Sequence, residues 1–346
     1  MNGIEPANTT VLVTGSSGFI GSHCVRELLA RGYRVRGTMR SLEREPRLRA
    51  ALSKHVDTSR FELVEANLME DAGWPEAMKG CRFVLHVASP VPSKPPKHED
   101  ELIVPARDGT LRVLRAAAKA GVERVVLTSS IAAVAEGHPR DPTRVFTEED
   151  WSNLEGEVSA YDKSKTLAER AAWDFVRNLP IDRPMELSVI NPGLVLGPLL
   201  EADYSVSVEA IRKLMRKEYP GVPRLGWPTV DVRDVADAHI AAMTAPEAAG
   251  KRFCCCVDFV WMKEMAEILN RNFGSEGYTL PTRTLPSFAV RLAGLFDKVT
   301  AVVVPRLGLE LRVSNERIKR VLGWRPRGTE EQIVSTGRSS IDLGVV

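Results

Sequence analysis

Short apolar runs alternate with amphipathic segments along the first part of the chain. Buried strands are predicted at residues 10–14, 33–39, 61–65, 83–88, 125–128 and 187–190. Helical periodicity falls between these runs, at residues 24–31, 47–54, 75–79, 101–120 and 161–178. Strands that alternate with helices are typical of a parallel sheet covered by helices on both faces. The pattern therefore predicts an α/β fold with a doubly wound parallel sheet of the Rossmann type.

The pattern changes after Pro192, where proline and glycine become frequent and the strict alternation is lost. Helices are still expected at residues 206–217, 232–244 and 262–273, and a strand at 252–257. We expect residues 1–190 to form the sheet domain. Residues 191–346 should form mainly a smaller α/β lobe, from which some strands return to the first domain. This lobe is expected to close over the carboxyl ends of the strands, where ligands bind in open α/β sheets.

A glycine-rich turn joins the first predicted strand to the first predicted helix. It reads Thr14-Gly15-Ser16-Ser17-Gly18-Phe19-Ile20-Gly21. Glycine permits a tight turn at Gly15, close approach of a pyrophosphate at Gly18 and close packing of the helix at Gly21. The N-terminus of the following helix offers free N–H groups to phosphates. The turn predicts a dinucleotide site, so we interpret residues 1–190 as the cofactor domain and the second lobe as mainly substrate-binding.

The end of the second predicted strand indicates which dinucleotide binds. A carboxylate there would hydrogen-bond the ribose 2′-hydroxyl of NAD and would repel a 2′-phosphate. This chain has Arg40 instead, with Arg44 and Arg47 close behind. Guanidinium groups suit phosphate, so NADP(H) is the predicted cofactor. The alternative is that Arg44, Arg47 and Arg49 form a solvated helix face, which we prefer for Arg49.

Tyr161 and Lys165 form a Y-x-x-x-K pair on a predicted helix. Residues i and i+4 share a helix face, so the phenol and the ammonium are expected to point into the same space. A nearby cation lowers the pKa of a phenol by about one to three units, which suits Tyr161 as proton donor to a forming alkoxide. Upstream, Thr128-Ser129-Ser130 ends a predicted strand, and Ser130 is the hydroxyl expected to hold the substrate oxygen. The alternative is a tyrosine and a lysine on an exposed helix.

Composition narrows the classes of function. Lys and Arg (47) nearly balance Asp and Glu (45), so the net charge of +2 favours neither nucleic acid nor an anionic membrane. The five cysteines lack the spacing of a disulfide framework or a metal site, and we interpret the run Cys254-Cys255-Cys256 as structural. No signal peptide and no membrane-spanning segment are predicted, so we expect a cytoplasmic protein. We also expect the protein to bind no metal.

Several residues have two interpretations. We prefer a core histidine at His86 and a helix N-cap at Asp231, and we regard Trp227 and Trp261 as more typical of core than of a pocket. The loops after two strands, Ser89-Pro90-Val91 and Asn191-Pro192-Gly193, are either plain connections or ligand contacts. The apolar stretch 288–309 is either core or a subunit contact, and a monomer or a homodimer is expected.

Together these residues resemble the extended short-chain dehydrogenase/reductases. Within them the chain is similar to the branch that holds dihydroflavonol reductase, cinnamoyl-CoA reductase and the methylglyoxal or aldehyde reductases of fungi and bacteria. The likeness runs from the glycine turn through Thr38-Met39-Arg40, His86-Val87-Ala88-Ser89-Pro90, Thr128-Ser129-Ser130 and Tyr161-Asp162-Lys163-Ser164-Lys165 to Asn191-Pro192-Gly193 and Leu322-Gly323-Trp324. The resemblance implies catalytic roles for Ser130, Tyr161 and Lys165.

The resemblance also implies the extent of the cofactor site, with Arg40 and Arg47 at the 2′-phosphate. The expected cofactor contacts are Gly15, Ser17, Gly18, Phe19, Ile20, Gly21, Arg40, Arg47, Asn67, Leu68, Val87, Ala88, Ser89, Thr128, Tyr161, Lys165, Pro192, Gly193 and Val195. Asn67 stands where the family usually has an aspartate that holds the adenine. An amide keeps an acceptor, so we expect altered affinity without loss of binding.

Two further departures bear on the substrate. Val158-Ser159-Ala160 precedes Tyr161 in place of the N-W-Y-C-Y signature of plant cinnamoyl-CoA reductases, and Ala135 replaces an asparagine of dihydroflavonol reductase. The resemblance therefore favours NADPH-dependent reduction of an aldehyde or ketone, as in the bacterial-type reductases. The expected pocket has few charges and is lined by Val91, Ala135, Tyr204 and Trp227. Apolar linings favour carbonyl compounds with an apolar body.

Two alternatives stay open. A nucleotide-sugar epimerase or a hydroxysteroid dehydrogenase would use the same catalytic residues with a different second lobe. An epimerase needs cations for a diphosphate, and the chain has a basic helix that resembles a solvated face, with Arg212, Lys213, Arg216 and Lys217. A non-catalytic dinucleotide sensor that binds a regulatory partner would not need Ser130, Tyr161 and Lys165 together.

Overall fold

The computed structural model describes residues 3–90, 96–182, 184–202, 206–218 and 220–346. A seven-stranded parallel sheet lies at its centre, in the order β10-β7-β5-β4-β1-β2-β3. The strands are β1 (Thr10–Thr14), β2 (Arg34–Met39), β3 (Phe61–Glu65), β4 (Phe83–His86), β5 (Arg124–Thr128), β7 (Glu186–Pro192) and β10 (Arg252–Cys255). The direction of winding reverses between β1 and β4, which confirms the predicted doubly wound fold and places a ligand crevice there.

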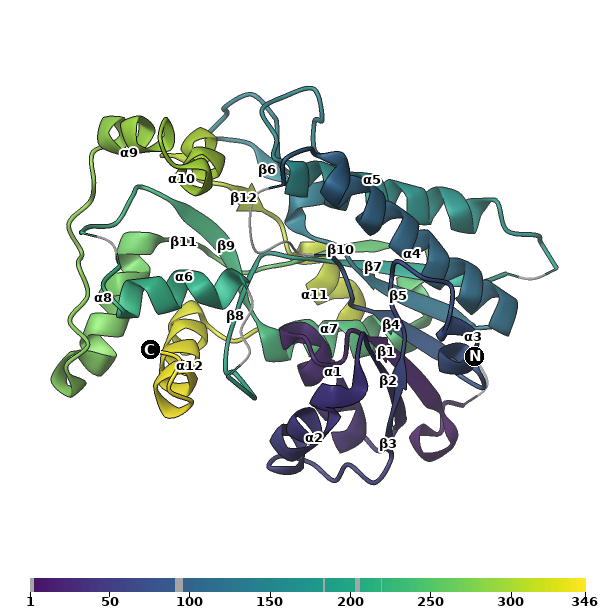
Figure 1. Cartoon of the computed structure of the whole chain (residues 1–346). Helices are drawn as coiled ribbons and strands as arrows, with labels where there is room; N and C mark the ends of the chain where they lie inside the picture. Colours follow the sequence, from purple (N-terminus) through teal and green to yellow (C-terminus); the bar gives the residue numbers. More distant parts are fainter. Residues whose placement is uncertain (1–2, 91–95, 183, 203–205, 219) are drawn as a thin grey trace.

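Helices cover both faces of the sheet (Figure 1). One face carries α1 (Phe19–Ala30), α2 (Glu45–Ser53), α7 (Val232–Thr244) and α11 (Glu316–Leu322). The other carries α3 (Trp74–Met78), α4 (Asp100–Ala120) and α5 (Ala160–Arg177). The apolar runs of β1, β4 and β5 are buried between these layers, so they read as continuous rather than alternating hydrophobic segments.

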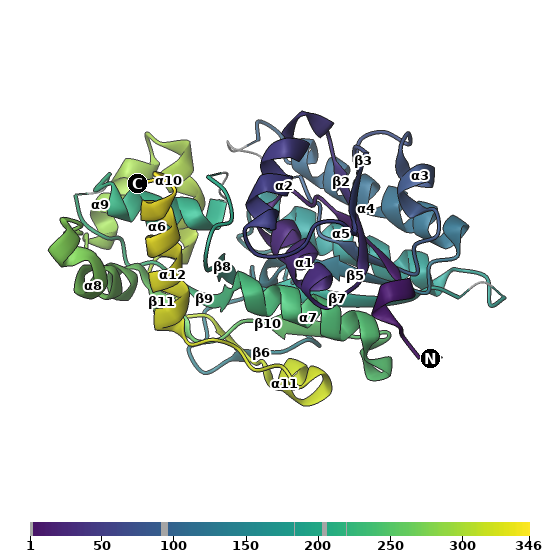
Figure 2. The ribbon, with the colours of Figure 1, turned by 90° about the horizontal axis from the view of Figure 1, so that it is seen from below.

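Most residues from 194 onward build a smaller lobe beside the sheet (Figure 2), whereas α7, α11 and β10 belong to the central layers. Its three-stranded sheet has the order β11-β9-β8 and consists of β8 (Leu194–Leu196), β9 (Gly226–Asp231) and β11 (Phe259–Trp261). Its helices are α6 (Val206–Met215), α8 (Met262–Phe273), α9 (Ser287–Gly294), α10 (Lys298–Val303) and α12 (Thr329–Asp342). A short parallel pair, β6 (Val145–Phe146) with β12 (Arg312–Val313), joins the end of this lobe to a loop of the first domain.

The two halves of the chain interleave. β10 follows the first two strands of the second lobe in sequence, yet it pairs in parallel with β7 of the central sheet. This is the strand that carries the cysteine run, and all five cysteines of the chain are buried and unpaired. Their structural interpretation is therefore confirmed. Within the described ranges, none of the helices is both long and apolar enough to cross a membrane.

Local sequence sets where the helices around the strand ends begin. Ser159 and Asp162 form a capping box, in which each side chain accepts the backbone N–H of the other, so α5 starts just before Tyr161. Gly18 is the N-cap of α1, which begins at Phe19 rather than at the predicted residue 24, because the glycine turn leads directly into the helix. Asp231 caps α7 by accepting the Arg233 N–H at 2.9 Å, as predicted.

Candidate active site

A cavity of about 2580 Å³ opens where the carboxyl ends of the central strands face the second lobe. Its walls come from the glycine turn, the ends of β2, β4, β5 and β7, the start of α5, and the lobe elements β8, β9, α6, α9 and α10. Pockets for one small molecule usually measure about 300–1,000 Å³. The volume therefore accommodates a dinucleotide together with a second ligand.

The cavity brings together almost all of the residues expected at the site. Its wall includes Gly15, Ser17, Gly18, Phe19, Ile20, Gly21, Arg40, Asn67, Leu68, Val87, Ala88, Ser89, Thr128, Ser130, Ala135, Tyr161, Lys165, Pro192, Gly193, Val195 and Trp227. Arg47 is not part of the described wall. Val91 and Tyr204, which were expected at the substrate, lie outside the described residues.

The glycine turn allows a ligand to approach the protein backbone closely. Gly15 has a φ of +64°, and a Cβ there would lie 3.1 Å from the Cα of Ala88. A Cβ on Gly21 would lie 2.2 Å from the carbonyl oxygen of Gly15, so the helix packs against the turn with no space for a side chain. Gly18 has an ordinary φ of −77° and only one close neighbour, at 3.3 Å. The space in front of Gly18 is cavity, which fits a pyrophosphate at the start of α1.

The arginines that follow β2 differ in their surroundings. Arg40 and Arg44 both line the cavity. The Arg47 Nε lies 2.9 Å from a carboxylate oxygen of Glu201, and an Arg44 nitrogen lies 3.3 Å from the other oxygen. The structure therefore places Arg44, rather than Arg47, beside Arg40. Sequence spacing did not distinguish them, because the helical turn Leu42–Arg44 redirects the chain before α2 begins.

Asn67 occupies the position where an adenine contact was expected. Its side-chain oxygen accepts the Met69 N–H at 3.1 Å, and its amide nitrogen donates to Glu70 at 2.9 Å. The indole N–H of Trp74 donates to the Asn67 carbonyl at 3.1 Å. The amide thus shapes the turn after β3, and one lone pair of its oxygen stays available for a ligand.

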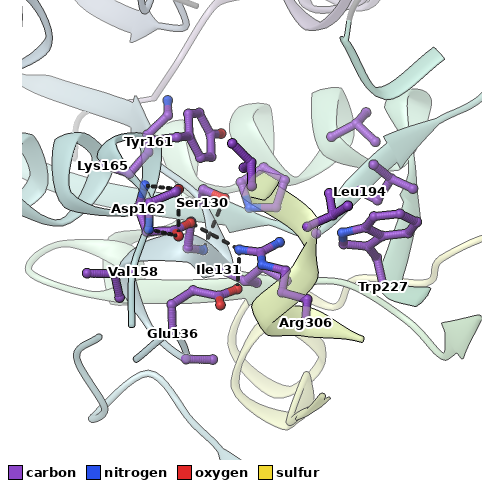
Figure 3. A pocket seen from close by; sticks show the side chains of 18 of the residues that line it. Ser130, Ile131, Glu136, Val158, Tyr161, Asp162, Lys165, Leu194, Trp227 and Arg306 are labelled. Carbon is purple, nitrogen blue, oxygen red and sulfur yellow. Dashed lines mark hydrogen bonds and ion pairs between the residues drawn. The ribbon is translucent and has the colours of Figure 1, made fainter. Parts of the chain in front are cut away.

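Ser130, Tyr161 and Lys165 meet at one side of the cavity (Figure 3). Ser130 follows β5, and its hydroxyl accepts the Ala132 N–H at 3.1 Å. Tyr161 stands in the first turn of α5 and exposes 37% of its surface, whereas Lys165 exposes 8%. The Lys165 Nζ lies 5.8 Å from the centre of the Tyr161 ring. The hydroxyl, the phenol and the ammonium are therefore neighbours, as the helical spacing and strand order predicted.

The electrostatics of these groups differ from the expectation in one respect. Enclosure by the cavity raises the pKa of Tyr161, while its side-chain hydrogen bond with Ser130 lowers that pKa in part. Burial lowers the pKa of Lys165 to about 8, opposed by the Glu169 carboxylate. The expected dominance of Lys165 over the phenol pKa is wrong for this structure, because desolvation outweighs the charges. The cation that lowers the Tyr161 pKa here is Arg306.

A buried polar network supports the back of the site. The Asn191 amide donates to the Ser130 carbonyl at 3.1 Å and to the Glu169 carboxylate at 2.8 Å. Glu169 in turn pairs with Arg252, whose guanidinium also donates to the Ala133 carbonyl at 3.3 Å. The side chains of Asn191, Glu169 and Arg252 are buried, and Ser130 and Ala133 take part through their backbone carbonyls. The network fixes the backbone that carries Ser130, and Arg252 was not predicted to have this role.

Two buried histidines, His86 at the end of β4 and His239 in α7, hold side chains at the strand ends. The Nδ1 of His86 lies 2.8 Å from the Thr14 hydroxyl, which also accepts the Ala88 N–H at 3.0 Å. His86 is fully buried, which confirms the core interpretation, and this burial lowers its pKa to about 3. The Thr128 hydroxyl lies 2.6 Å from Nε2 of His239, whose pKa burial lowers to about 4. Both rings are neutral at neutral pH, and the Thr128 hydroxyl is committed to the core.

Sequence reasoning missed a charged cluster beside the phenol. An Arg306 nitrogen lies 2.6 Å from a Glu136 carboxylate oxygen and 3.1 Å from an Asp162 oxygen (Figure 3). Burial raises the pKa of Glu136 to about 7, against the lowering effect of Arg306. The C-terminal segment brings Arg306 to residues far upstream, so no local spacing could have indicated the cluster.

The substrate side of the cavity is more charged than expected. Ala135 and Trp227 line it with apolar neighbours such as Ile131 and Leu194, but the wall also includes Arg140, Arg144, Lys213, Arg224, Arg306 and Arg312. The expectation of few charges was therefore wrong, because Lys213, Arg224, Arg306 and Arg312 come from the second lobe, and Arg140 and Arg144 from the loop that leads to β6. Several are matched by carboxylates: Arg144 by Asp150 at 2.8 Å, Arg312 by Glu310 at 3.1 Å and Lys213 by Glu209 at 3.9 Å.

Comparison with known proteins places this site in a family. Residues 11–256 match the NAD dependent epimerase/dehydratase family. The chain belongs to this family. Cinnamoyl-CoA reductase CAD2 of Medicago truncatula is 40% identical over 277 residues, which cover 77% of this chain and 81% of that protein. Tetraketide alpha-pyrone reductase 1 of Arabidopsis thaliana is 32% identical over 320 residues, which cover 90% and 94%.

The fold of this chain also matches a solved structure over nearly its whole length. Yeast methylglyoxal/isovaleraldehyde reductase Gre2, complexed with NADPH, superimposes with a TM-score of 0.82 and 29% identity, covering 98% of this chain and 100% of that one. The resemblance to the extended short-chain dehydrogenase/reductases, in the branch of cinnamoyl-CoA and methylglyoxal reductases, is confirmed. The chain is an oxidoreductase of this superfamily.

Proposed function

We propose that this chain reduces an aldehyde or ketone to the alcohol with NADPH, by means of Ser130, Tyr161 and Lys165. The observation that carries the proposal is the meeting of these three side chains in the cavity that also contains the glycine turn. The turn fits a pyrophosphate, and Arg40 and Arg44 at the cavity wall suit a 2′-phosphate. The NADPH complex of Gre2 supports the same cofactor here.

The residues divide the chemistry between them. When bound, the reduced nicotinamide supplies a hydride to the carbonyl carbon. The Ser130 hydroxyl donates a hydrogen bond to the carbonyl oxygen, and Tyr161 transfers its phenolic proton to that oxygen as negative charge develops there. The buried Lys165 ammonium offers donors to the cofactor ribose beside Tyr161 and stabilises the phenolate left behind. The product is the alcohol, and Tyr161 regains a proton from solvent.

A second candidate reaction is the reduction of an acyl-CoA thioester. Several relatives are named cinnamoyl-CoA reductases, among them the Medicago truncatula protein at 40% identity. The wall of the cavity contains Arg224, whose guanidinium lies 5.3 Å from the centre of the Trp261 ring and has no carboxylate partner among the described residues. We favour the free carbonyl compound, because the cations of the wall are largely balanced by nearby carboxylates and Val158-Ser159-Ala160 precedes Tyr161.

A substrate panel separates these reactions. NADPH consumption would be measured with alkyl and aryl aldehydes, ketones, acyl-CoA thioesters and a UDP-sugar, with Tyr161→Phe as the inactive control. We expect kcat/KM to rise with the apolar size of the aldehyde or ketone, by up to about tenfold or somewhat more per well-buried methylene. A consistent preference for acyl-CoA would favour the second candidate. A preference for the UDP-sugar, or no turnover with any member, would refute the proposal.

A further inference from the structure

Glu201 crosses from the second lobe to the arginines that follow β2. Its carboxylate lies 3.3 Å from an Arg44 nitrogen and 2.9 Å from the Arg47 Nε. Arg44 ends the turn Leu42–Arg44, and Arg47 is in the first turns of α2, whereas Glu201 follows β8. One carboxylate of the lobe thus holds two guanidinium groups of the cofactor domain.

Glu201 is the fixed partner in this contact. Only 9% of its surface is exposed, whereas the side chains of Arg44 and Arg47 are 44% and 53% exposed. The segment leading to Glu201 is attached on two sides: the Pro198 carbonyl lies 2.9 Å from Nε2 of His23 in α1, and the Leu199 N–H donates to Ser339 of α12 at 2.9 Å. An anchored carboxylate restricts the long side chains that contact it, rather than following them.

The geometry separates the carboxylate from the ligand. Arg40 and Arg44 line the cavity, whereas Glu201 is not part of its described wall. A phosphate in the cavity can therefore reach Arg44 at a wall to which Glu201 does not contribute. A guanidinium has five N–H donors and can hold two anions at different edges. Restricting a long side chain before binding removes part of the entropy cost of binding.

We propose that Glu201 is a positioning residue for 2′-phosphate recognition: by fixing Arg44, which lines the cavity, it makes the second lobe part of the preference for NADPH. This inference rests on the proposed use of NADPH. It assigns to a lobe otherwise concerned with the substrate a share in selecting the cofactor. Leu199, in the lobe segment that ends at Glu201, also belongs to a buried apolar cluster against which Phe19, at the start of α1, packs. Cofactor choice and lobe position are thereby connected by one short segment.

The test compares two fragments of the cofactor that differ only in the 2′-phosphate. The dissociation constants of 2′,5′-ADP and AMP would be measured on the wild type and on Glu201→Gln, which keeps the shape and removes the charge. We expect the preference of the wild type for 2′,5′-ADP to fall by about three- to tenfold in the variant, as when one long side chain must be ordered on binding. AMP affinity should stay within twofold, since AMP has no 2′-phosphate. A general loss of structure would instead weaken both fragments.

Two further variants serve as controls. Asp237→Asn removes another ion pair between elements of this face, in which Asp237 lies 2.6 Å from Arg31, and it should leave the 2′,5′-ADP to AMP ratio unchanged. Glu201→Asp keeps the charge on a shorter side chain and should give an intermediate ratio, which can be measured even if Glu201→Gln does not fold. An unchanged ratio, or tighter binding of 2′,5′-ADP, in the Glu201 variants would overturn the inference. A wild type that binds 2′,5′-ADP no better than AMP would instead refute the proposed cofactor.

Discussion

Replacing Arg252 by methionine tests whether the buried network behind Ser130 supports the fold and the chemistry. Arg252 is 6% exposed and Glu169 is fully buried, and the two form an ion pair. The guanidinium also donates to the carbonyls of Glu148 at 3.0 Å, Asp150 at 2.7 Å and Ala133 at 3.3 Å. Methionine has a similar length but none of these donors. The substitution leaves one carboxylate and three carbonyl groups without this partner.

The expected loss of stability follows from the charge that remains. Breaking a buried ion pair by removing one partner usually costs about 3–5 kcal/mol, because the other charge stays buried and uncompensated. Among the described residues, Glu169 then keeps the hydrogen bonds from the Asn191 amide and the Trp173 indole N–H, at 2.8 and 3.2 Å, and its charge interaction with Lys165, which offsets part of this cost. The Asn191 amide also holds the Ser130 carbonyl, so Ser130 should shift with it. Misplacement of a catalytic group by about 1 Å costs up to about a hundredfold in rate, and kcat should fall in that range.

The free energy of unfolding would be measured by chemical denaturation, with tryptophan fluorescence as the signal. The rate of reduction would be measured by the consumption of NADPH. The double variant Glu169→Leu/Arg252→Met removes both charges, so it should recover at least about 1 kcal/mol relative to Arg252→Met. A loss below about 1 kcal/mol in the single variant, the median range for exposed ion pairs, would refute the reasoning. A double variant less stable than Arg252→Met would show that the uncompensated Glu169 charge is not the cause.

Three further predictions concern the cavity. Tyr161→Phe should lower the rate of carbonyl reduction by about a hundredfold or more, the scale for losing a general acid, and leave NADPH affinity within a few-fold; near-normal turnover would remove Tyr161 from the mechanism. Because burial lowers the pKa of Lys165 to about 8, the ammonium is lost as pH rises through that value, so kcat/KM for reduction should fall there. Lys165→Arg should lack this limb, and a wild-type profile that stays flat well above that pH would contradict the assignment. Gly21→Ala places a Cβ 2.2 Å from the Gly15 oxygen and should cost about 1–3 kcal/mol in a thermal unfolding assay; Gly274→Ala, with open space around it, is the control and should be neutral.

The main sheet was predictable because its inner strands are buried on both faces. Such strands read as short apolar runs, and β1 matches its predicted bounds. The edge strand β3 also matches its predicted bounds, although only Phe61 in it is buried. The helices α7 and α8 also match, since each has one apolar face against a core. The two-residue strands β6 and β12 were not predicted, because a pair that short depends on its partner for its conformation.

The chemistry of the site was predictable where it depends on local spacing. Tyr161 and Lys165 share a helix face because they are four residues apart, and the glycines of the turn are set by the backbone they must allow. Arg44 and Arg47 could not be distinguished in this way, because both lie near the end of β2 and only the turn between them decides which one faces the cavity.

Sequence by itself thus determined the doubly wound sheet, the nucleotide turn and the serine, tyrosine and lysine of the site, all of which follow from neighbours along the chain. Tertiary structure alone decided the contacts between segments that are distant in the sequence. These contacts place Arg252 behind Ser130, Arg306 near Tyr161, and Glu201 against the arginines that follow β2. The physical reason is that a helix or a turn is set by interactions over a few residues, whereas burial and ion pairing depend on which distant segments share a volume. The pKa of Tyr161 belongs to the second group, since it is raised mainly by desolvation, which depends on how distant segments pack around the phenol.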